Sequence, residues 1–139
     1  MITKEELINE LNMDLALEYA AAIQYIQHAA TIKGPGYTTF IEELLIHADE
    51  EIDHAKKISD KISYLGGIPT LNVQKRKSSE DTVEMLRQDL EGEQTAIARY
   101  RTRIIQAKEL NEFGTVEMLT KIVSDEEEHE NDLKTILGL

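Results

Sequence analysis

Two acidic stretches of the sequence, EEIDH at residues 50–54 and DEEEH at residues 125–129, contain the same Glu-x-x-His pattern. Side chains three residues apart share one face of a helix, so each pattern places a carboxylate beside an imidazole. Glu126 follows Glu51 by 75 residues, and the histidines of the two patterns are separated by the same interval. The two stretches are therefore equivalent parts of an internal repeat.

The repeat extends to two further glutamates and two tyrosines. Each Glu-x-x-His glutamate is preceded by another glutamate at a distance of 33 residues, Glu18 in the first half and Glu93 in the second. Each of these is followed seven residues later by a tyrosine, Tyr25 or Tyr100. Apolar residues recur around them at steps of three and four, which is typical of amphipathic helices. The pattern predicts helices at about residues 4–33, 38–65, 80–110 and 115–137.

The predicted helices are long enough to pack side by side as a four-helix bundle, which buries one apolar stripe from each. Short turns, one at residues 34–36 and one near Gly114, join them into two αα-hairpins. The segment 66–79 can span the length of the bundle, so we expect a crossover that leaves the second and third helices parallel. We predict an all-α fold with a single domain over residues 1–139: an antiparallel four-helix bundle of two αα-hairpins joined by a long crossover.

Composition and charge exclude several classes of protein. The 139 residues include no cysteine, which rules out disulfides, thiol catalysis and sites in which cysteine binds zinc or an iron–sulfur cluster. A formal net charge of −12 disfavours nucleic-acid binding and favours cations as partners. The most apolar stretch, residues 15–32, carries polar residues such as Glu18 and Gln24, so we expect no membrane contact. The first residues lack a signal-peptide pattern, which makes the cytoplasm the expected compartment.

Each predicted core stripe carries a glutamate near its centre, which is costly unless the carboxylate is protonated, paired or bound to a metal. In an antiparallel hairpin, residues equally far from the turn lie at the same height, so the four carboxylates should meet in one layer. Four carboxylates supply four negative charges and, with two imidazoles, suit two divalent ions of iron or manganese. The predicted metal ligands, which are also the predicted catalytic residues, are Glu18, Glu51, His54, Glu93, Glu126 and His129.

These motifs resemble those of the ferritin-like di-iron carboxylate superfamily, and within it those of bacterioferritin. The resemblance covers nearly the whole chain and rests on Glu18, QYxxH at 24–28, DEExxHA at 49–55, LxGxPxLN at 65–72 and DExxH at 125–129. It implies two terminal carboxylate ligands, two bridging carboxylates and one imidazole on each metal. The terminal carboxylates would be those of Glu18 and Glu93, and the bridging carboxylates those of Glu51 and Glu126. The imidazoles would be those of His54 and His129.

The resemblance implies a ferroxidase that oxidises Fe(II) to Fe(III) with dioxygen or hydrogen peroxide, for iron storage and detoxification. Two iron ions per chain are expected, with manganese as the alternative metal, in a homo-oligomer that is at least a dimer. A rubrerythrin-like di-iron peroxidase or oxidase without storage is the alternative, although Ala96 stands where that family has a further glutamate. A dimanganese catalase has the same types of ligand and stays open, whereas a non-enzymatic bundle would leave the repeat unexplained.

Two departures from bacterioferritin change what the resemblance implies. Ile52 occupies the position of the methionine that binds haem between two bacterioferritin subunits, and isoleucine has no donor atom. We therefore expect no haem. The sequence stops at Leu139, without the short fifth helix of typical ferritins, so the size of the oligomer stays open between a dimer and a closed shell.

Four residues beside the predicted ligands are expected to orient them. Tyr25 and Tyr100 lie two turns from a ligand on the same stripe, where each hydroxyl can donate a hydrogen bond to a carboxylate across the bundle. Metal-binding imidazoles usually donate their free N–H to a carboxylate, and an acidic residue precedes each predicted bridging glutamate. The expected pairs are Asp125 with His54 and Glu50 with His129.

Two further histidines have no assigned chemistry. His47 lies one turn before Glu51 on the same face, and its counterpart in the repeat is Ile122. We expect a hydrogen-bonded core histidine there, with an extra metal ligand or a place on an iron path as alternatives. His28 matches the family motif, but its role stays open.

Overall fold

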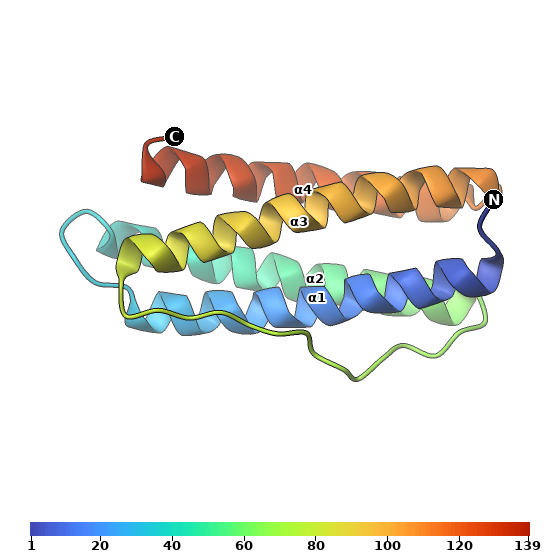
Figure 1. Cartoon of the computed structure of the whole chain (residues 1–139), viewed down its shortest axis with the longest axis horizontal. Helices are drawn as coiled ribbons and strands as arrows, with labels where there is room; N and C mark the ends of the chain where they lie inside the picture. Colours follow the sequence, from blue (N-terminus) through green and yellow to red (C-terminus); the bar gives the residue numbers. More distant parts are fainter.

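The computed structural model describes all 139 residues as four long helices, one short 3₁₀ helix and no strand. The elements are α1 (Lys4–Thr31), η1 (Thr38–Phe40), α2 (Ile41–Tyr64), α3 (Thr82–Glu109) and α4 (Phe113–Leu137). The predicted all-α four-helix bundle is confirmed (Figure 1). None of the helices is both long and apolar enough to cross a membrane.

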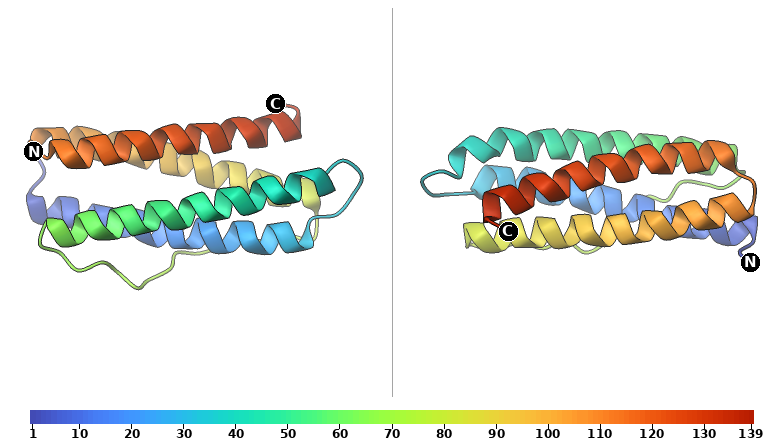
Figure 2. Two further views of the ribbon diagram at one scale, coloured as in Figure 1. Left: turned by 180° about the vertical axis from the view of Figure 1, so that it is seen from behind. Right: turned by 90° about the horizontal axis from the view of Figure 1, so that it is seen from above.

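The helices form two antiparallel hairpins, α1 with α2 and α3 with α4 (Figure 1). Residues 65–81 run back along α1, so α3 starts at the same end of the bundle as α2 and runs parallel to it (Figure 2). Between the hairpins, α1 packs against α3 and α2 packs against α4. The crossover therefore brings the repeated faces of the two hairpins opposite each other.

Local capping sets where two of the helices begin. At α1, the Thr3 hydroxyl accepts a hydrogen bond from the Glu6 N–H at 3.1 Å, and the Glu6 carboxylate accepts one from the Thr3 N–H at 2.8 Å. This reciprocal capping box satisfies N–H groups that have no partner within the helix. Asp81 accepts a hydrogen bond from the Glu84 N–H at 2.9 Å, which starts α3 at Thr82 rather than at residue 80.

Other helix ends differ from the predicted bounds by up to three residues. α1 stops at Thr31 because Ile32 is extended, with ψ of 138°, and Gly34 then enters the left-handed region with φ of 116°. α2 begins at Ile41 because residues 38–40 form a tighter 3₁₀ turn first. These shifts leave the faces of the helices unchanged.

Side chains of α1 hold the crossover against the bundle. Asn12 accepts a hydrogen bond from the Thr70 N–H at 2.8 Å and donates one to the Ile68 carbonyl at 3.1 Å. Further along α1, Gln24 accepts a hydrogen bond from the Lys77 N–H at 2.7 Å. The crossover therefore has a fixed path along α1, although it contains no helix or strand.

Gly67 allows the crossover to leave α2 in close contact with α1. A Cβ atom at this position would lie 2.5 Å from Ile8 Cγ2 and 3.1 Å from Ile62 Cγ2. Because the first distance is far below van der Waals contact, only glycine fits here without a shift of its neighbours.

Two apolar clusters fill the bundle at its two ends. The cluster near the start of α1 contains Leu7, Leu11, Leu15, Ala55, Ile58, Ile62, Leu65, Tyr100, Ala107, Leu119 and Ile122. The cluster near the end of α1 contains Tyr25, Ala29, Ile32, Leu44, Ala48, Leu86, Leu90 and Leu133. Glu18, which is only 1% exposed, lies on α1 between the two clusters and belongs to a polar layer that separates them.

Candidate metal centre

The polar layer contains one carboxylate from each helix and an imidazole from two of them. Glu18 comes from α1 and Glu93 from α3, while α2 and α4 each supply a Glu-x-x-His pair. All of these residues are buried, with at most 2% of each exposed. They are the six residues that the sequence singled out as metal ligands: Glu18, Glu51, His54, Glu93, Glu126 and His129. The structure brings all six together.

The six side chains form two overlapping groups, each of which offers four ligand atoms within 4.8 Å of one another. One group is Glu18, Glu51, His54 and Glu126, and the other is Glu51, Glu93, Glu126 and His129. Glu51 and Glu126 belong to both groups, so each can face two ions at once. Each group could hold one metal ion, and the two groups share two carboxylates.

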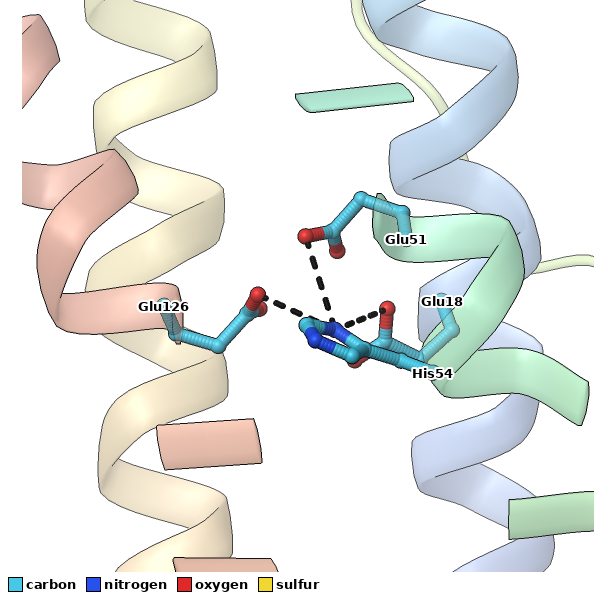
Figure 3. A group of neighbouring side chains, drawn as sticks. All are labelled: Glu18, Glu51, His54 and Glu126. Atoms are coloured by element: carbon cyan, nitrogen blue, oxygen red, sulfur yellow. Dashed lines mark ion pairs between the residues drawn. The ribbon is translucent and has the colours of Figure 1, made fainter. Parts of the chain in front are cut away.

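The first group surrounds the Nδ1 atom of His54 (Figure 3). This atom lies 3.3 Å from Glu126 Oε1, 3.6 Å from Glu18 Oε2 and 3.7 Å from Glu51 Oε1. The three carboxylates come from α4, α1 and α2 and point toward the same imidazole nitrogen. Residues far apart in the sequence thus converge on one point of the bundle.

The second group surrounds the Nδ1 atom of His129. The distances are 3.0 Å to Glu51 Oε1, 3.3 Å to Glu93 Oε1 and 3.4 Å to Glu126 Oε1. The Oε1 atoms of Glu51 and Glu126 each lie within 3.7 Å of both imidazoles. The two shared carboxylates therefore occupy the middle of the layer, between the two histidines.

The polar layer also contains buried polar atoms that form no hydrogen bond. They are Glu18 Oε2, Glu51 Oε1, His54 Nδ1, Glu93 Oε2 and both carboxylate oxygens of Glu126. Buried polar atoms are normally paired, and each unpaired one costs about 1–3 kcal/mol. Cations bound among these oxygen and nitrogen atoms would satisfy them. Four carboxylates and two imidazoles suit a pair of divalent first-row metals.

Burial raises the pKa of Glu18, Glu51 and Glu93, and the nearby carboxylate of Glu126 raises each of these pKa values further. Burial also opposes ionisation of Glu126, but its close contacts with the imidazoles of His129 and His54 outweigh burial and lower the pKa of Glu126. Without cations, ionisation of Glu18, Glu51 and Glu93 is therefore less favourable than ionisation of an exposed glutamate.

Burial alone would lower the pKa of His54, but its contacts with Glu126 and Glu18 raise that pKa to about 11. Burial likewise opposes protonation of His129, and contacts with Glu126 and Glu93 raise its pKa to about 11. Both imidazoles are therefore protonated at neutral pH when no cation is bound. A metal ion that binds Nδ1 must displace a proton, so metal binding and proton release are coupled.

A carboxylate outside the layer holds the second nitrogen of each imidazole. Asp125 Oδ2 lies 2.8 Å from His54 Nε2, and Glu50 Oε2 lies 2.9 Å from His129 Nε2. These are the pairs that the sequence predicted. An Nε2–H that donates to a carboxylate leaves Nδ1 facing the ligand layer. The two outer carboxylates are 40% and 38% exposed, so they connect the buried rings to solvent.

Two tyrosines hold the carboxylates that belong to only one group. The Tyr25 hydroxyl donates a hydrogen bond of 2.6 Å to Glu93 Oε1, and the Tyr100 hydroxyl donates one to Glu18 Oε1. Burial raises the pKa of both phenols well above its usual value, and the neighbouring carboxylates add to the effect. Both phenols therefore stay neutral and keep the proton that they donate.

The repeat explains His28, whose role the sequence left open. His28 is buried, and its Nδ1 lies 2.8 Å from Asp89 Oδ2. In the other half, Asp14 accepts a hydrogen bond of 2.8 Å from Nε of the buried Arg103. Arg103 follows His28 by 75 residues, and Asp89 follows Asp14 by the same interval. Both pairs join α1 to α3, so His28 has a structural role at this contact.

His47 is a buried, hydrogen-bonded histidine, 1% exposed, with Nε2 at 3.1 Å from Asp132 Oδ2. Its ring stacks on that of His129 with the centroids 4.0 Å apart. Burial, with a further contribution from the charge of His129, lowers the pKa of His47 to about 4. Sequence reasoning missed Asp132 and Glu43, which also lies beside His47. The available signal was helical spacing, because Asp132 follows His129 by three residues and Glu43 precedes His47 by four.

A cavity of about 170 Å³ between α1 and α3 reaches the ligand layer. Its lining includes Glu18 and Glu93 from the layer, and also Lys77 and Arg99, whose side chains are 56% and 26% exposed. The lining of the cavity therefore includes both partly exposed side chains and carboxylates of the polar layer.

The chain is similar to known proteins over nearly its whole length. The family model described as "Ferritin-like domain" matches residues 8–139. Bacterioferritins of Mycobacterium leprae and Brucella melitensis are each 30% identical over 135 residues, covering 96% of this chain and 85% and 84% of those proteins. A crystal structure of "ferritin like, diiron-carboxylate proteins" from Bacillus anthracis superposes with a TM-score of 0.93 and 36% identity, and the match covers 99% of both chains.

Proposed function

The chain belongs to the ferritin-like domain family, and we propose that it is a ferroxidase, which oxidises Fe(II) to Fe(III) with dioxygen or hydrogen peroxide inside the bundle. The observation that carries this proposal is the pair of overlapping groups, which together offer four buried carboxylates and two imidazoles. The similarity to bacterioferritins supports iron as the substrate and iron storage and detoxification as the purpose.

Fe(II) is the substrate, and each residue of the layer has a part in holding it. Glu18 and His54 would bind one ion, and Glu93 and His129 would bind the other. The carboxylates that belong to both groups, those of Glu51 and Glu126, would bridge the pair. Two ferrous ions held there would each give up one electron and become Fe(III). With two protons from solvent, the two electrons reduce dioxygen to hydrogen peroxide, or hydrogen peroxide to two molecules of water.

The chain itself contributes charge, orientation and proton control. Four ionised carboxylates match the charge of two divalent ions in a site from which water is largely excluded, where electrostatic attraction is strong. When the imidazoles lose the proton on Nδ1, Asp125 and Glu50 keep the proton on Nε2, and so they fix the tautomer that binds metal. The cavity between α1 and α3, with a volume of about 170 Å³, would receive the small oxidant.

The proposed active form is a homo-oligomer of at least two copies. Apolar side chains that are 40–48% exposed lie on the hairpin of α1 and α2: Met13, Ile23, Ile26, Leu45, Ile46 and Ile52. These side chains would supply part of the apolar contact between the copies. Storage of oxidised iron would further require that the copies enclose a space.

The proposal is tested by anaerobic titration of the metal-free protein with Fe(II), followed by exposure to air and measurement of near-ultraviolet absorbance. We expect saturation at two Fe(II) per chain and a rise in absorbance when air is admitted. Glu18→Ala should abolish this step, whereas Glu42→Ala, at an exposed position of α2, should leave it intact. Saturation at the same ratio in the Glu18 variant would refute the proposed site.

Storage is tested separately, by continued addition of Fe(II) in air with light scattering to detect precipitation. Uptake of many ions per chain into a soluble particle is the expected result. Uptake that stops at two ions per chain would remove the storage role. Turnover of hydrogen peroxide with an added reductant would then identify the rubrerythrin-like alternative, a peroxidase without storage.

A further inference from the structure

A third group of metal-ligating side chains lies outside the paired centre, where α2 and α4 meet solvent. His47 Nε2 lies 3.1 Å from Asp132 Oδ2 and 3.7 Å from Glu43 Oε1, and one ligand atom from each residue lies within 4.8 Å of the others. The histidine is buried, whereas the side chains of Asp132 and Glu43 are 38% and 40% exposed. The group is therefore anchored in the core and open to water on one side.

The charges of this group are unbalanced. No lysine or arginine forms an ion pair with Glu43 or Asp132, whose only such contact is with His47. Two carboxylates directed at one imidazole nitrogen, with no cationic side chain to balance them, form a site that suits a divalent cation.

His47 is also a buried polar side chain with an unsatisfied atom. Its Nδ1 atom forms no hydrogen bond, although only 1% of the residue is exposed. The equivalent residue in the other half of the repeat is Ile122, which fills the core there with 1% exposed. Packing alone would be served better by an apolar side chain at position 47, because a buried polar atom without a partner is costly.

The other two members of the group also depart from the repeat. The equivalent of Glu43 is Met118, and the equivalent of Asp132 is Lys57. The positions that the repeat relates to this group therefore hold a methionine and an isoleucine in the second half and a lysine in the first half. The group is not a by-product of the duplication that built the paired centre, and it exists at only one end of that centre.

The group adjoins the paired centre directly. The His47 ring stacks on the His129 ring, with centroids 4.0 Å apart and an angle of 24° between the planes. Asp132 lies one turn beyond His129 on α4, and His47 lies one turn before Glu51 on α2. Oxygen and nitrogen atoms that can bind a metal therefore extend from the solvent side of the group, through His47 and His129, to the middle of the polar layer.

We propose that Glu43, His47 and Asp132 form a third divalent-cation site, which takes Fe(II) from solvent and delivers it to the paired centre. The two carboxylates and Nε2 of the imidazole would bind the ion, and water would complete its coordination on the open side. The delivery role rests on the proposed function of the paired centre, whereas the binding role does not.

Binding is tested by anaerobic titration of the metal-free protein with Co(II), whose visible absorption reports the number of bound ions. We expect three Co(II) per chain in the natural protein and two in the double variant Glu43→Gln/Asp132→Asn. The control is Glu42→Gln/Glu128→Gln, which removes the same charge from exposed positions of the same two helices and should still bind three. Amides of the same shape keep the fold, because the amide oxygen introduced at position 132 can still accept the hydrogen bond from His47.

The two proposals fail in different ways in this titration. The natural protein and the double variant differ in the number of bound Co(II) only by the ion at the third site. The Co(II) ions that the double variant still binds are those of the paired centre. Equal binding by the natural protein and the double variant would refute the third site, whatever that number is. A difference of one, with fewer than two ions left, would refute the paired centre and keep the third site.

Delivery is tested by stopped-flow oxidation at two Fe(II) per chain in air. A charged entry site raises the local concentration of cations, so the initial rate should fall about tenfold in Glu43→Gln/Asp132→Asn. The initial rate should fall much less in the control variant Glu42→Gln/Glu128→Gln, because its substituted side chains lie outside the group. A third site that disappears from the Co(II) titration with no change in this rate would overturn the delivery role.

Discussion

The hydroxyl of Tyr25 on α1 donates a hydrogen bond of 2.6 Å to Oε1 of Glu93 on α3. Tyr100 on α3 donates the equivalent bond to Glu18 on α1, so each tyrosine holds the carboxylate of the helix across from it. The two bonds are related by the internal repeat. They orient the carboxylates of Glu93 and Glu18 without any cation.

Removal of the Tyr25 hydroxyl should therefore weaken metal binding without disturbing the fold. In Tyr25→Phe, Glu93 loses its fixed orientation, and we expect the affinity for Co(II) at the paired centre to fall about tenfold. The change is measured by competition with a chelator of known affinity. Tyr64→Phe, at a tyrosine that is 75% exposed, is the matched control. An unchanged affinity in Tyr25→Phe would show that the hydrogen bond does not preorganise the site.

Asp125 should matter more for metal binding than its partly exposed position suggests. In Asp125→Ala, the Nε2–H of His54 loses its acceptor at 2.8 Å, and the ring is free to rotate or change tautomer. We expect the affinity for metal to fall about 10–100-fold, as is typical for such partners. Chelator competition measures it, with Glu128→Ala on the same helix as control. Equal affinities of the two variants would contradict the role of Asp125.

Metal binding should release protons and strengthen as the pH rises. The pKa values of about 11 for His54 and His129 mean that both rings are protonated at neutral pH without metal. Each ion must displace at least one proton, so the affinity per ion should increase about tenfold per pH unit between about pH 6 and 8. Zn(II) titration in weak buffer with a pH indicator should show at least two protons released per pair of ions. An affinity that does not change with pH would be inconsistent with protonated imidazoles.

Gly67 should be intolerant of any side chain. In Gly67→Ala the new Cβ would lie 2.5 Å from Ile8 Cγ2, and we expect a loss of about 1–3 kcal/mol in the free energy of unfolding. Chemical denaturation measures this loss. Gly92→Ala is the control, because a Cβ there meets no atom within 4 Å and alanine stabilises a helix interior by about 1 kcal/mol. Similar effects of the two substitutions would mean that the contact at Gly67 relaxes easily.

The purified protein should contain no haem. Ile52 is 40% exposed on α2 and offers no atom that can bind haem iron. The visible spectrum of protein produced with an ample supply of haem should therefore lack a Soret band. A Soret band at one haem per two chains would show that another residue takes the place of the missing methionine.

The helices could be predicted because their signals are local. The capping box of Thr3 and Glu6 and the spacing of apolar residues depend only on neighbouring residues. The predicted helix 4–33 therefore starts where α1 starts and ends only two residues after it. The ends that moved, such as the start of α2 at Ile41, depend on short turns whose geometry is set by contacts elsewhere. A turn of 3₁₀ helix and a turn of α-helix differ little in sequence pattern.

The six residues of the ligand layer could be predicted for a different reason. In a hairpin, the level of each glutamate along the bundle axis follows from its distance in sequence from the turn. The 75-residue repeat gives the same levels in both hairpins, so no knowledge of side-chain conformation is needed. Regular helices convert that spacing directly into a shared face and a shared level.

The sequence by itself therefore determined the bundle, its crossover and which carboxylates and imidazoles share one level, because helical periodicity and the repeat act along the chain. Only the tertiary structure decided which neighbours those residues meet on other helices, such as Asp89 beside His28 and Asp132 beside His47. These contacts join different helices and residues far apart in the sequence. They depend on how α1 and α3, or α2 and α4, are rotated and spaced against each other, and no pattern within a single helix specifies that.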